Sequence, residues 1–334
     1  MSSSTSSSEP VRSDAGEPGR RAGQAWRTWL LVLVVLVFIE GGVRAIEDRL
    51  SVDIQHIRSI HDIADSLDDE GETTGARTVL FLGNSLTRRG LDQVVFEKTL
   101  ESEGVDDLAF AEVYPDDTAV LDWLYLYGKE IAPAGTPDFV VIDFGFWHLE
   151  DRSPWRAQTY RLGRHFVSWS ALPRLFRDDV TSLADRANVA LSKVSATFAN
   201  RERVARRALS FLPYYEVSAQ QINDLASPDD AGGADAAPES YDRLTRLIRT
   251  VEDSGAELVL VAMPTREGYD LDSRIAEIAA ANGAVLVDAR TVPNLGEEDF
   301  ADPIHLDPDT GAALYSEHAA ELLAPILAGG GPVR

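Results

Sequence analysis

The chain has 334 residues, of which 31 are Lys or Arg and 55 are Asp or Glu, giving a formal net charge of −24. This balance disfavours a nucleic acid partner, because phosphates attract basic proteins. The absence of cysteine excludes disulfides, a thiol nucleophile and cysteine metal sites. The length is ample for a buried core, in one large domain or two small ones.

The first 43 residues divide into a polar tail and an apolar segment. Residues 1–24 are rich in Ser, Gly, Pro and charge, and we expect a disordered tail. Residues 25–43 contain the unbroken apolar run Trp29–Ile39 and are close to the about 20 residues that span a bilayer. A cleaved signal peptide is the alternative, but no small-residue cleavage site follows the run. We therefore favour an uncleaved transmembrane anchor in the cell membrane. Arginines precede its apolar run at positions 12, 20, 21 and 27, which predicts a cytoplasmic N-terminus and an extracytoplasmic remainder.

Residues 44–76 are predicted to form a helical stalk and a linker. Apolar residues recur at 46, 50, 54, 57, 60, 64 and 67, with the spacing of one helical face. Such a helix would pack on the following domain or on a partner stalk. The acidic stretch 68–75 is expected to be the linker.

Residues 77–328 alternate short β-rich runs with amphipathic helices. The predicted strands are 79–82, 108–113, 139–144, 257–262 and 284–287, and the predicted helices are 91–103, 118–130, 241–254, 271–282 and 309–327. Strands that are apolar throughout indicate a sheet covered on both faces. We therefore predict a flavodoxin-like, three-layer α/β/α sandwich with a five-stranded parallel sheet.

A predicted helical insertion, residues 152–240, interrupts this alternation. Residues 152–215 hold 12 basic and only 4 acidic residues, between two strongly acidic stretches. The apolar residues from Val180 to Phe198 follow a helical stripe, and 227–239 is expected to be a flexible loop. The arginines either contact anionic lipid or a polyanionic glycan, or pair internally with the acidic core.

A serine follows the first predicted strand in the segment Phe81-Leu82-Gly83-Asn84-Ser85-Leu86-Thr87. Ligands of open parallel sheets bind beyond the carboxyl ends of the strands, so Ser85 would present its hydroxyl at that edge. The alternative is that Ser85 only caps the next helix.

A histidine with a nearby acid precedes the last predicted helix. Asp302 lies three residues before His305, so a compact turn would let the carboxylate orient the imidazole. The alternative is a loop histidine with an incidental acidic neighbour. With Ser85, these residues would form a Ser-His-Asp triad.

In this order, the two motifs resemble the SGNH/GDSL hydrolase superfamily. Gly83-Asn84-Ser85-Leu86 is similar to its Gly-Asp-Ser block, with Asn84 in place of Asp, and Asp302-Pro303-Ile304-His305-Leu306 followed by Gly311 is similar to its Asp-x-x-His block. The resemblance covers about 78–151 and 241–327. It implies that Ser85 is the nucleophile, His305 the base and Asp302 its orienting acid.

The resemblance also implies an oxyanion hole built from a glycine and an asparagine. The chain has neither where they are expected: Tyr114-Pro115-Asp116-Asp117-Thr118 follows the second strand, and Trp147 stands at the asparagine position. Besides the Ser85 N–H, a backbone N–H of Asp116 or Asp117 and a donor on Trp147 or His148 are the candidate replacements. Loss of one oxyanion donor typically costs about 10²–10³ in rate.

These residues predict a membrane-anchored, extracytoplasmic serine esterase, deacetylase or O-acyltransferase acting on O-acyl esters of small molecules or envelope glycans. We expect no cofactor, because no metal-ligand spacing or phosphate-binding loop is found. The competing hypothesis is a degenerate, non-catalytic domain that serves as a glycan-binding or scaffold subunit.

Overall fold

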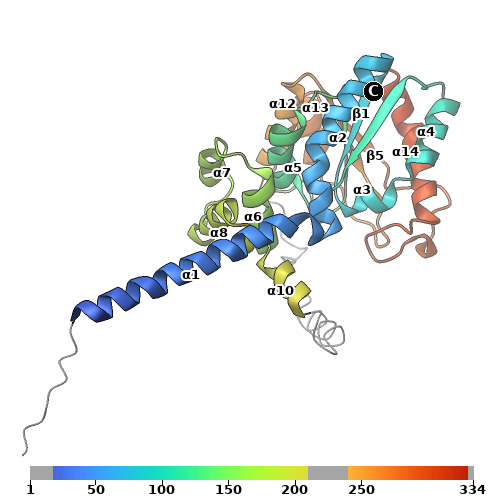
Figure 1. Ribbon diagram of the computed structural model, residues 1–334. Helices are drawn as coiled ribbons and strands as arrows, with labels where there is room; N and C mark the ends of the chain where they lie inside the picture. Colours follow the sequence, from blue (N-terminus) through green and yellow to red (C-terminus); the bar gives the residue numbers. More distant parts are fainter. Residues whose placement is uncertain (1–17, 210–239, 330–334) are drawn as a thin grey trace, which may run out of the picture.

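The computed structural model describes residues 18–209 and 240–329, and its centre is a parallel sheet (Figure 1). The five strands are β1 (Arg77–Leu82), β2 (Leu108–Val113), β3 (Phe139–Phe144), β4 (Glu257–Ala262) and β5 (Val285–Asp288). Their order is β2-β1-β3-β4-β5 and every pair is parallel. This is the flavodoxin-like order. The predicted α/β fold is confirmed, with strand bounds that differ from the predicted ones by at most two residues.

Helices cover both faces of the sheet. One face packs against α2 (Val52–Thr74), α5 (Val120–Leu126), α12 (Asp242–Glu252) and α13 (Ser273–Ala281); the other packs against α3 (Ser85–Gly90), α4 (Gln93–Ser102) and α14 (Gly311–Leu327). Alternate residues of each strand enter the two cores: Leu80 and Leu82 face α2 and α5, whereas Val79 and Phe81 face α4 and α14. Because both faces are covered, the central strands β1, β3 and β4 are apolar along most of their length.

The N-terminal helix α1 (Pro18–Ile46) projects from the domain (Figure 1). The stretch Trp26–Arg49, which runs through α1 into the turn that follows it, is long and apolar enough to cross a membrane, and its apolar part is almost wholly exposed. Residues 18–24, expected in a disordered tail, instead begin this helix. The rest of that tail lies outside the described residues.

The segment after α1 is part of the sandwich. A 3-10 turn, η1 (Glu47–Arg49), separates α1 from α2, whose Ile57, Ile60 and Leu67 are buried against the sheet. The predicted apolar stripe is therefore a core face. The predicted linker is wrong, because α2 continues to Thr74 and ends at Gly75, which has a left-handed φ of 74°. Acidic residues 68–70 occupy the last turns of this helix because its exposed side tolerates them.

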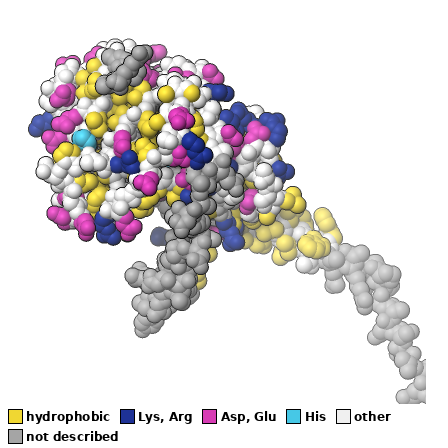
Figure 2. All heavy atoms as spheres, turned by 180° about the vertical axis from the view of Figure 1, so that it is seen from behind, with side chains coloured by type: hydrophobic (Ala, Val, Ile, Leu, Met, Phe, Trp, Pro, Cys, Tyr) yellow, Lys and Arg dark blue, Asp and Glu magenta, His cyan; other side chains and the backbone are white. Residues whose placement is uncertain are grey.

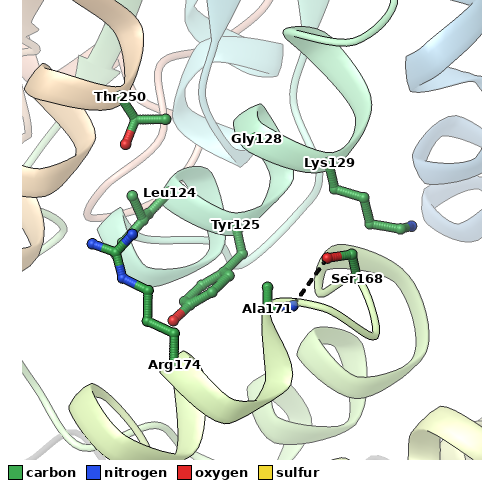
Figure 3. A pocket seen from close by; sticks show the side chains of 8 residues that line it. All are labelled: Leu124, Tyr125, Gly128, Lys129, Ser168, Ala171, Arg174 and Thr250. Carbon is green, nitrogen blue, oxygen red and sulfur yellow. Dashed lines mark hydrogen bonds between the residues drawn. The ribbon is translucent and has the colours of Figure 1, made fainter. Parts of the chain in front are cut away.

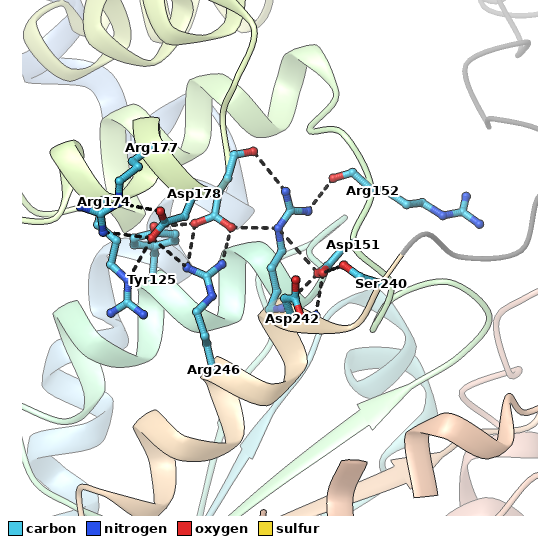
Figure 4. Close-up of polar contacts among 11 residues, drawn as sticks. Tyr125, Asp151, Arg152, Arg174, Arg177, Asp178, Ser240, Asp242 and Arg246 are labelled. Carbon is cyan, nitrogen blue, oxygen red and sulfur yellow. Dashed lines mark hydrogen bonds and ion pairs between the residues drawn. The ribbon is translucent and has the colours of Figure 1, made fainter. Parts of the chain in front are cut away.

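The insertion begins with α6 (Arg156–Arg161), the π-helical turn η3 (Leu162–Phe166), α7 (Leu172–Asp178), α8 (Leu183–Val194), α9 (Ala196–Ala199) and α10 (Arg201–Leu209). The predicted loop 227–239 lies outside the described residues. The buried carboxylate of Asp179 joins the insertion to α12 and α5: it accepts hydrogen bonds from Arg243 (3.0 Å), Arg246 and Tyr125 (2.7 Å). Tyr125 and Arg246 are labelled among these polar contacts in Figure 4. Arg164 likewise pairs with the buried Glu47 (2.8 Å). Part of the basic insertion is thus paired internally.

A carboxyl group is buried at the end of β3. Asp143 is 1% exposed and accepts a hydrogen bond from Tyr315 Oη (3.0 Å). Burial raises the pKa of Asp143 from 3.8 to about 7, although the hydrogen bond from Tyr315 opposes the rise. The folded protein therefore favours the neutral acid at this position.

We expect the substitution Asp143→Asn to change the pH dependence of stability. Because the folded pKa is raised, the wild type loses stability relative to the variant as pH rises from about 4 to about 7, by at most about 1.4 kcal/mol per pH unit. Above that window the difference becomes constant. Thermal unfolding midpoints of both proteins across this pH range measure the effect. Equal midpoint shifts at every pH would contradict it.

Candidate active site

Ser85 is the first residue of α3, directly beyond the carboxyl end of β1. Gly83 allows the tight turn, because a Cβ there would lie 1.8 Å from Thr87 Oγ1. The side chain that caps α3 belongs to Asn84: its Oδ1 accepts from Leu86 N (2.9 Å), while its Nδ2 donates to Thr118 O (2.9 Å). An aspartate could not donate the second bond, so the departure at Asn84 has a structural reason. The helix cap is thus supplied by Asn84, and the Ser85 hydroxyl has a different partner.

That partner is His305, 220 residues away in the sequence. His305 Nε2 lies 2.8 Å from Ser85 Oγ, and His305 Nδ1 lies 2.8 Å and 3.0 Å from the two oxygens of Asp302. Asp302 is fixed by accepting hydrogen bonds from the backbone N–H of Ile304 (3.0 Å) and His305 (2.9 Å). The three residues singled out from the sequence therefore form one hydrogen-bonded chain.

The protonation states of these three side chains follow from their contacts. Burial raises the pKa of Asp302, but hydrogen bonds from Ile304 N–H and from the side chain and N–H of His305 outweigh it, so the net effect is a lowered pKa. An ionised Asp302 must accept from Nδ1–H, which leaves Nε2 as the acceptor for the Ser85 hydroxyl. This protonation pattern is the one that a general base requires.

The turn after β2 is held from two sides. The Asp116 N–H donates to Asp53 of α2 (2.9 Å), and the guanidinium of Arg161 in α6 donates to the carbonyl oxygens of Asp116 and Asp117. Asp117 has a φ of 55°, in the left-handed region that favours glycine. Because the Asp116 N–H is already bonded to Asp53, the Asp117 N–H is the candidate oxyanion donor of the two.

The loop after β3 places Trp147 and His148 side by side, with ring centroids 4.8 Å apart. Trp147 also packs edge-on against Trp155 (5.7 Å) and beneath Arg152 (5.0 Å). Gly145 N–H donates to His148 Nδ1 (3.2 Å), so the neutral ring carries its proton on Nε2. Burial lowers the pKa of His148 to about 4; a backbone hydrogen bond with Gly145 opposes this, and the charges of Arg152 and His305 add smaller lowering contributions. His148 is therefore a neutral donor near neutral pH.

Sequence reasoning did not find Asp53 and Arg161. Neither belongs to a motif, and both lie outside the segments that carry the family resemblance. The missing glycine after β2 is the one signal that points to them, since a left-handed residue other than glycine needs support from its surroundings.

Two described cavities lie on the insertion side of the domain. One of about 160 Å³ is lined by residues of α5, α7 and α12 together with Lys129 and Ser168 (Figure 3). The other, of about 440 Å³, lies between the insertion and α12, next to the contacts drawn in Figure 4. Neither is lined by Ser85, Asp302 or His305. Within 18–209 and 240–329, no group of three or more His, Asp or Glu could hold a metal ion.

Comparison with known proteins gives distant structural similarity. No protein-family model matches the chain, and no curated protein matches it. Among solved structures, the chain is similar to TesA, with 14% identity and a TM-score of 0.34 over 75% of this chain and 99% of that chain. It is also similar to the lipase Lip_vut3 from a goat rumen metagenome, with 8% identity and a TM-score of 0.34 over 74% of this chain and 98% of that chain.

Proposed function

We propose that this chain is a membrane-anchored serine esterase or deacetylase, or an O-acyltransferase, that acts on O-acyl esters. One observation carries the proposal: the hydrogen-bonded chain Ser85 Oγ, His305 Nε2, His305 Nδ1 and Asp302 carboxylate. Such a chain activates a hydroxyl that is otherwise a weak nucleophile.

The reaction follows from these contacts. His305 Nε2 takes the proton of Ser85 as Oγ bonds to the ester carbonyl carbon, and Asp302 stabilises the imidazolium that forms. As the tetrahedral intermediate collapses, His305 returns the proton to the leaving alcohol oxygen, and the acyl group remains on Ser85. An incoming hydroxyl then gives its proton to His305 as its oxygen bonds to the acyl carbon, and His305 returns that proton to Ser85 Oγ as the acyl–Ser85 bond breaks. With water the product is a free acid; with a sugar hydroxyl it is a new ester.

The oxyanion of the intermediate needs donors near Ser85. In this proposal they are the N–H groups of Ser85 and Asp117 together with His148 Nε2–H, which replaces the asparagine amide. A neutral imidazole is suited to this task because it donates without titrating near neutral pH.

Envelope glycans are the proposed class of substrate. Trp147 and Trp155 lie beside the Asp117 turn, and the Trp155 indole donates to the Asp117 carboxylate (3.1 Å). Aromatic rings next to fixed polar groups are suited to binding sugars, which present both apolar and hydroxyl surfaces.

The alternative function is a glycan-binding or scaffold subunit without catalysis. The observation in its favour is Trp147, which stands where an oxyanion donor is expected and packs against His148 and Trp155. A fluorophosphonate probe separates the two functions, because it reacts only with an activated serine. Enzymatic function predicts labelling of the full chain at Ser85 and turnover of p-nitrophenyl acetate. Neither would occur in a scaffold.

The membrane anchor is proposed to remain attached in the mature protein. Glu40 of α1 accepts hydrogen bonds from Ser195 Oγ (2.8 Å) and Ala196 N (2.7 Å) in the insertion. Four residues after the predicted anchor 25–43, the buried Glu47 of η1 bonds Arg164 and Asn200 and fixes the chain that leaves α1. Removal of α1 as a signal peptide would break the Glu40 contacts, which favours retention.

The proposed orientation has the N-terminus in the cytoplasm. In intact cells, a cysteine introduced as Ser8→Cys should be shielded from a membrane-impermeant maleimide, because the arginines that precede the span stay inside. Val94→Cys in α4, whose parent side chain is 75% exposed, should be labelled. The chain has no cysteine of its own, so each label reports one site. The reverse pattern would overturn this orientation.

A further inference from the structure

Helix α8 exposes a continuous apolar face. The exposed residues of this helix are Leu183, Ala184, Ala187, Ala190, Leu191 and Val194, which recur at the spacing of one helical side. Leu183 is 82% exposed, Leu191 47% and Val194 54%. Surface helices ordinarily present polar residues on the face that is exposed to water. An exposed face made of apolar residues therefore marks a contact surface.

The opposite face of α8 is fixed to the domain. Val189 and Ser192 are buried, and the backbone of Val189 packs so closely on Gly163 that a Cβ there would lie 2.3 Å from the Val189 carbonyl oxygen. The exposed face of α8 therefore cannot turn inward without breaking this packing.

The end of α8 lies where the apolar span of α1 ends. Arg44 Nη2 donates to Val194 O (2.7 Å), and Glu40 bonds the residues that follow. Glu40 is the first charged residue after the apolar run Trp29–Ile39, so it marks the edge of the hydrocarbon layer. Figure 1 shows α8 beside the half of α1 that joins the domain.

The surroundings of this face also suit a bilayer surface. Trp169 is 64% exposed, and Lys193 Nζ lies 5.5 Å above its ring. Tryptophan and lysine with an apolar stem are typical of the membrane–water interface. Figure 2 shows Lys and Arg side chains on the domain beside the apolar helix, a charge that complements anionic headgroups.

We propose that α8 lies in the membrane interface on the side of the catalytic domain, with its apolar face against lipid. The proposal rests on the membrane anchor of the proposed function. A helix of 12 residues is about 18 Å long, enough for three turns in the interfacial plane. Together with α1, it would hold the catalytic domain against the bilayer in one orientation.

Single cysteines test the proposal in the full chain, reconstituted in phosphatidylcholine–phosphatidylglycerol vesicles. Ala187→Cys and Ala190→Cys report the apolar face, and both replace a small exposed side chain by another small one. Val34→Cys reports the span, and Val94→Cys is the matched exposed site on α4, on the other side of the sheet. Each is labelled with an environment-sensitive fluorophore, and quenching by lipids brominated along the acyl chain is measured.

We expect blue-shifted emission and shallow quenching at 187 and 190, deep quenching at 34, and neither effect at 94. Labels at 187 and 190 that behave like 94, while 34 is quenched, would overturn the interfacial helix and leave the anchor intact. Loss of quenching at 34 as well would overturn the anchor itself. A blue shift at 187 without lipid quenching, accompanied by energy transfer between labelled chains, would show that a second copy covers this face and would also overturn the proposal.

Discussion

The variant Ser85→Ala is expected to lower the rate of p-nitrophenyl ester hydrolysis by at least about 10⁴-fold. Ser85 Oγ is the atom that bonds to the carbonyl carbon, and its contact with His305 (2.8 Å) is what activates it. Alanine keeps the turn after β1, because Gly83 and the Asn84 cap shape that turn. The kcat of the purified full chain measures the effect, and fluorophosphonate labelling should be lost in parallel.

Ser102→Ala is the matched control for this prediction. Ser102 ends α4, where its hydroxyl donates only to the Thr99 carbonyl (2.7 Å). This variant should keep both hydrolysis and labelling, and both proteins should keep the thermal midpoint of the wild type within a few degrees. If Ser85→Ala hydrolysed the ester as fast as Ser102→Ala, the proposed nucleophile would be wrong.

The sequence predicted the fold where short-range patterns decide the structure. The five strands were predictable because they are apolar runs bounded by polar turns, and Gly83 and Gly311 occur where close packing admits only glycine. The linker at 68–75 was predicted wrongly, because composition alone does not show that α2 continues along the domain to Gly75.

Of the candidate site, the Ser85, His305 and Asp302 group was predictable from the sequence, whereas the support of the oxyanion donors was not. Asp302 and His305 are three residues apart, so a local turn brings them together, and the fold adds Ser85. The oxyanion side depends on contacts between distant segments. Asp53, Asp116 and Arg161 come from three different elements, and no spacing in the sequence relates them. The structure also shows that the α8 stripe faces outward, whereas periodicity shows only that a stripe exists.

The second large effect is expected at Arg161, which we infer to be a positioning residue for the oxyanion donor. Its side chain is 6% exposed, and its guanidinium holds the carbonyl oxygens of Asp116 and Asp117. A left-handed φ costs a residue with a Cβ roughly 1–2 kcal/mol, and these two hydrogen bonds stabilise it. Losing them should let the turn relax and should move the Asp117 N–H away from the oxyanion.

Arg161→Met is therefore expected to lower kcat by about 10²-fold with little change in KM, the size of one lost oxyanion donor. Arg161→Lys should recover only part of this loss. A lysine ammonium lacks the planar, two-pronged guanidinium that donates to both carbonyl oxygens at once. Arg164→Lys is the matched control, because Arg164 pairs with Glu47 instead of with this turn. Steady-state kinetics of the three variants on one ester measure the effect.

Rescue distinguishes positioning from a general loss of structure. Glycine adopts a positive φ without steric cost, so adding Asp117→Gly to Arg161→Met should restore a large part of kcat. A packing defect at Arg161 would not respond to a change of backbone preference 44 residues away. An unchanged kcat in Arg161→Met, or a double variant no faster than the single one, would show that the turn does not depend on this arginine.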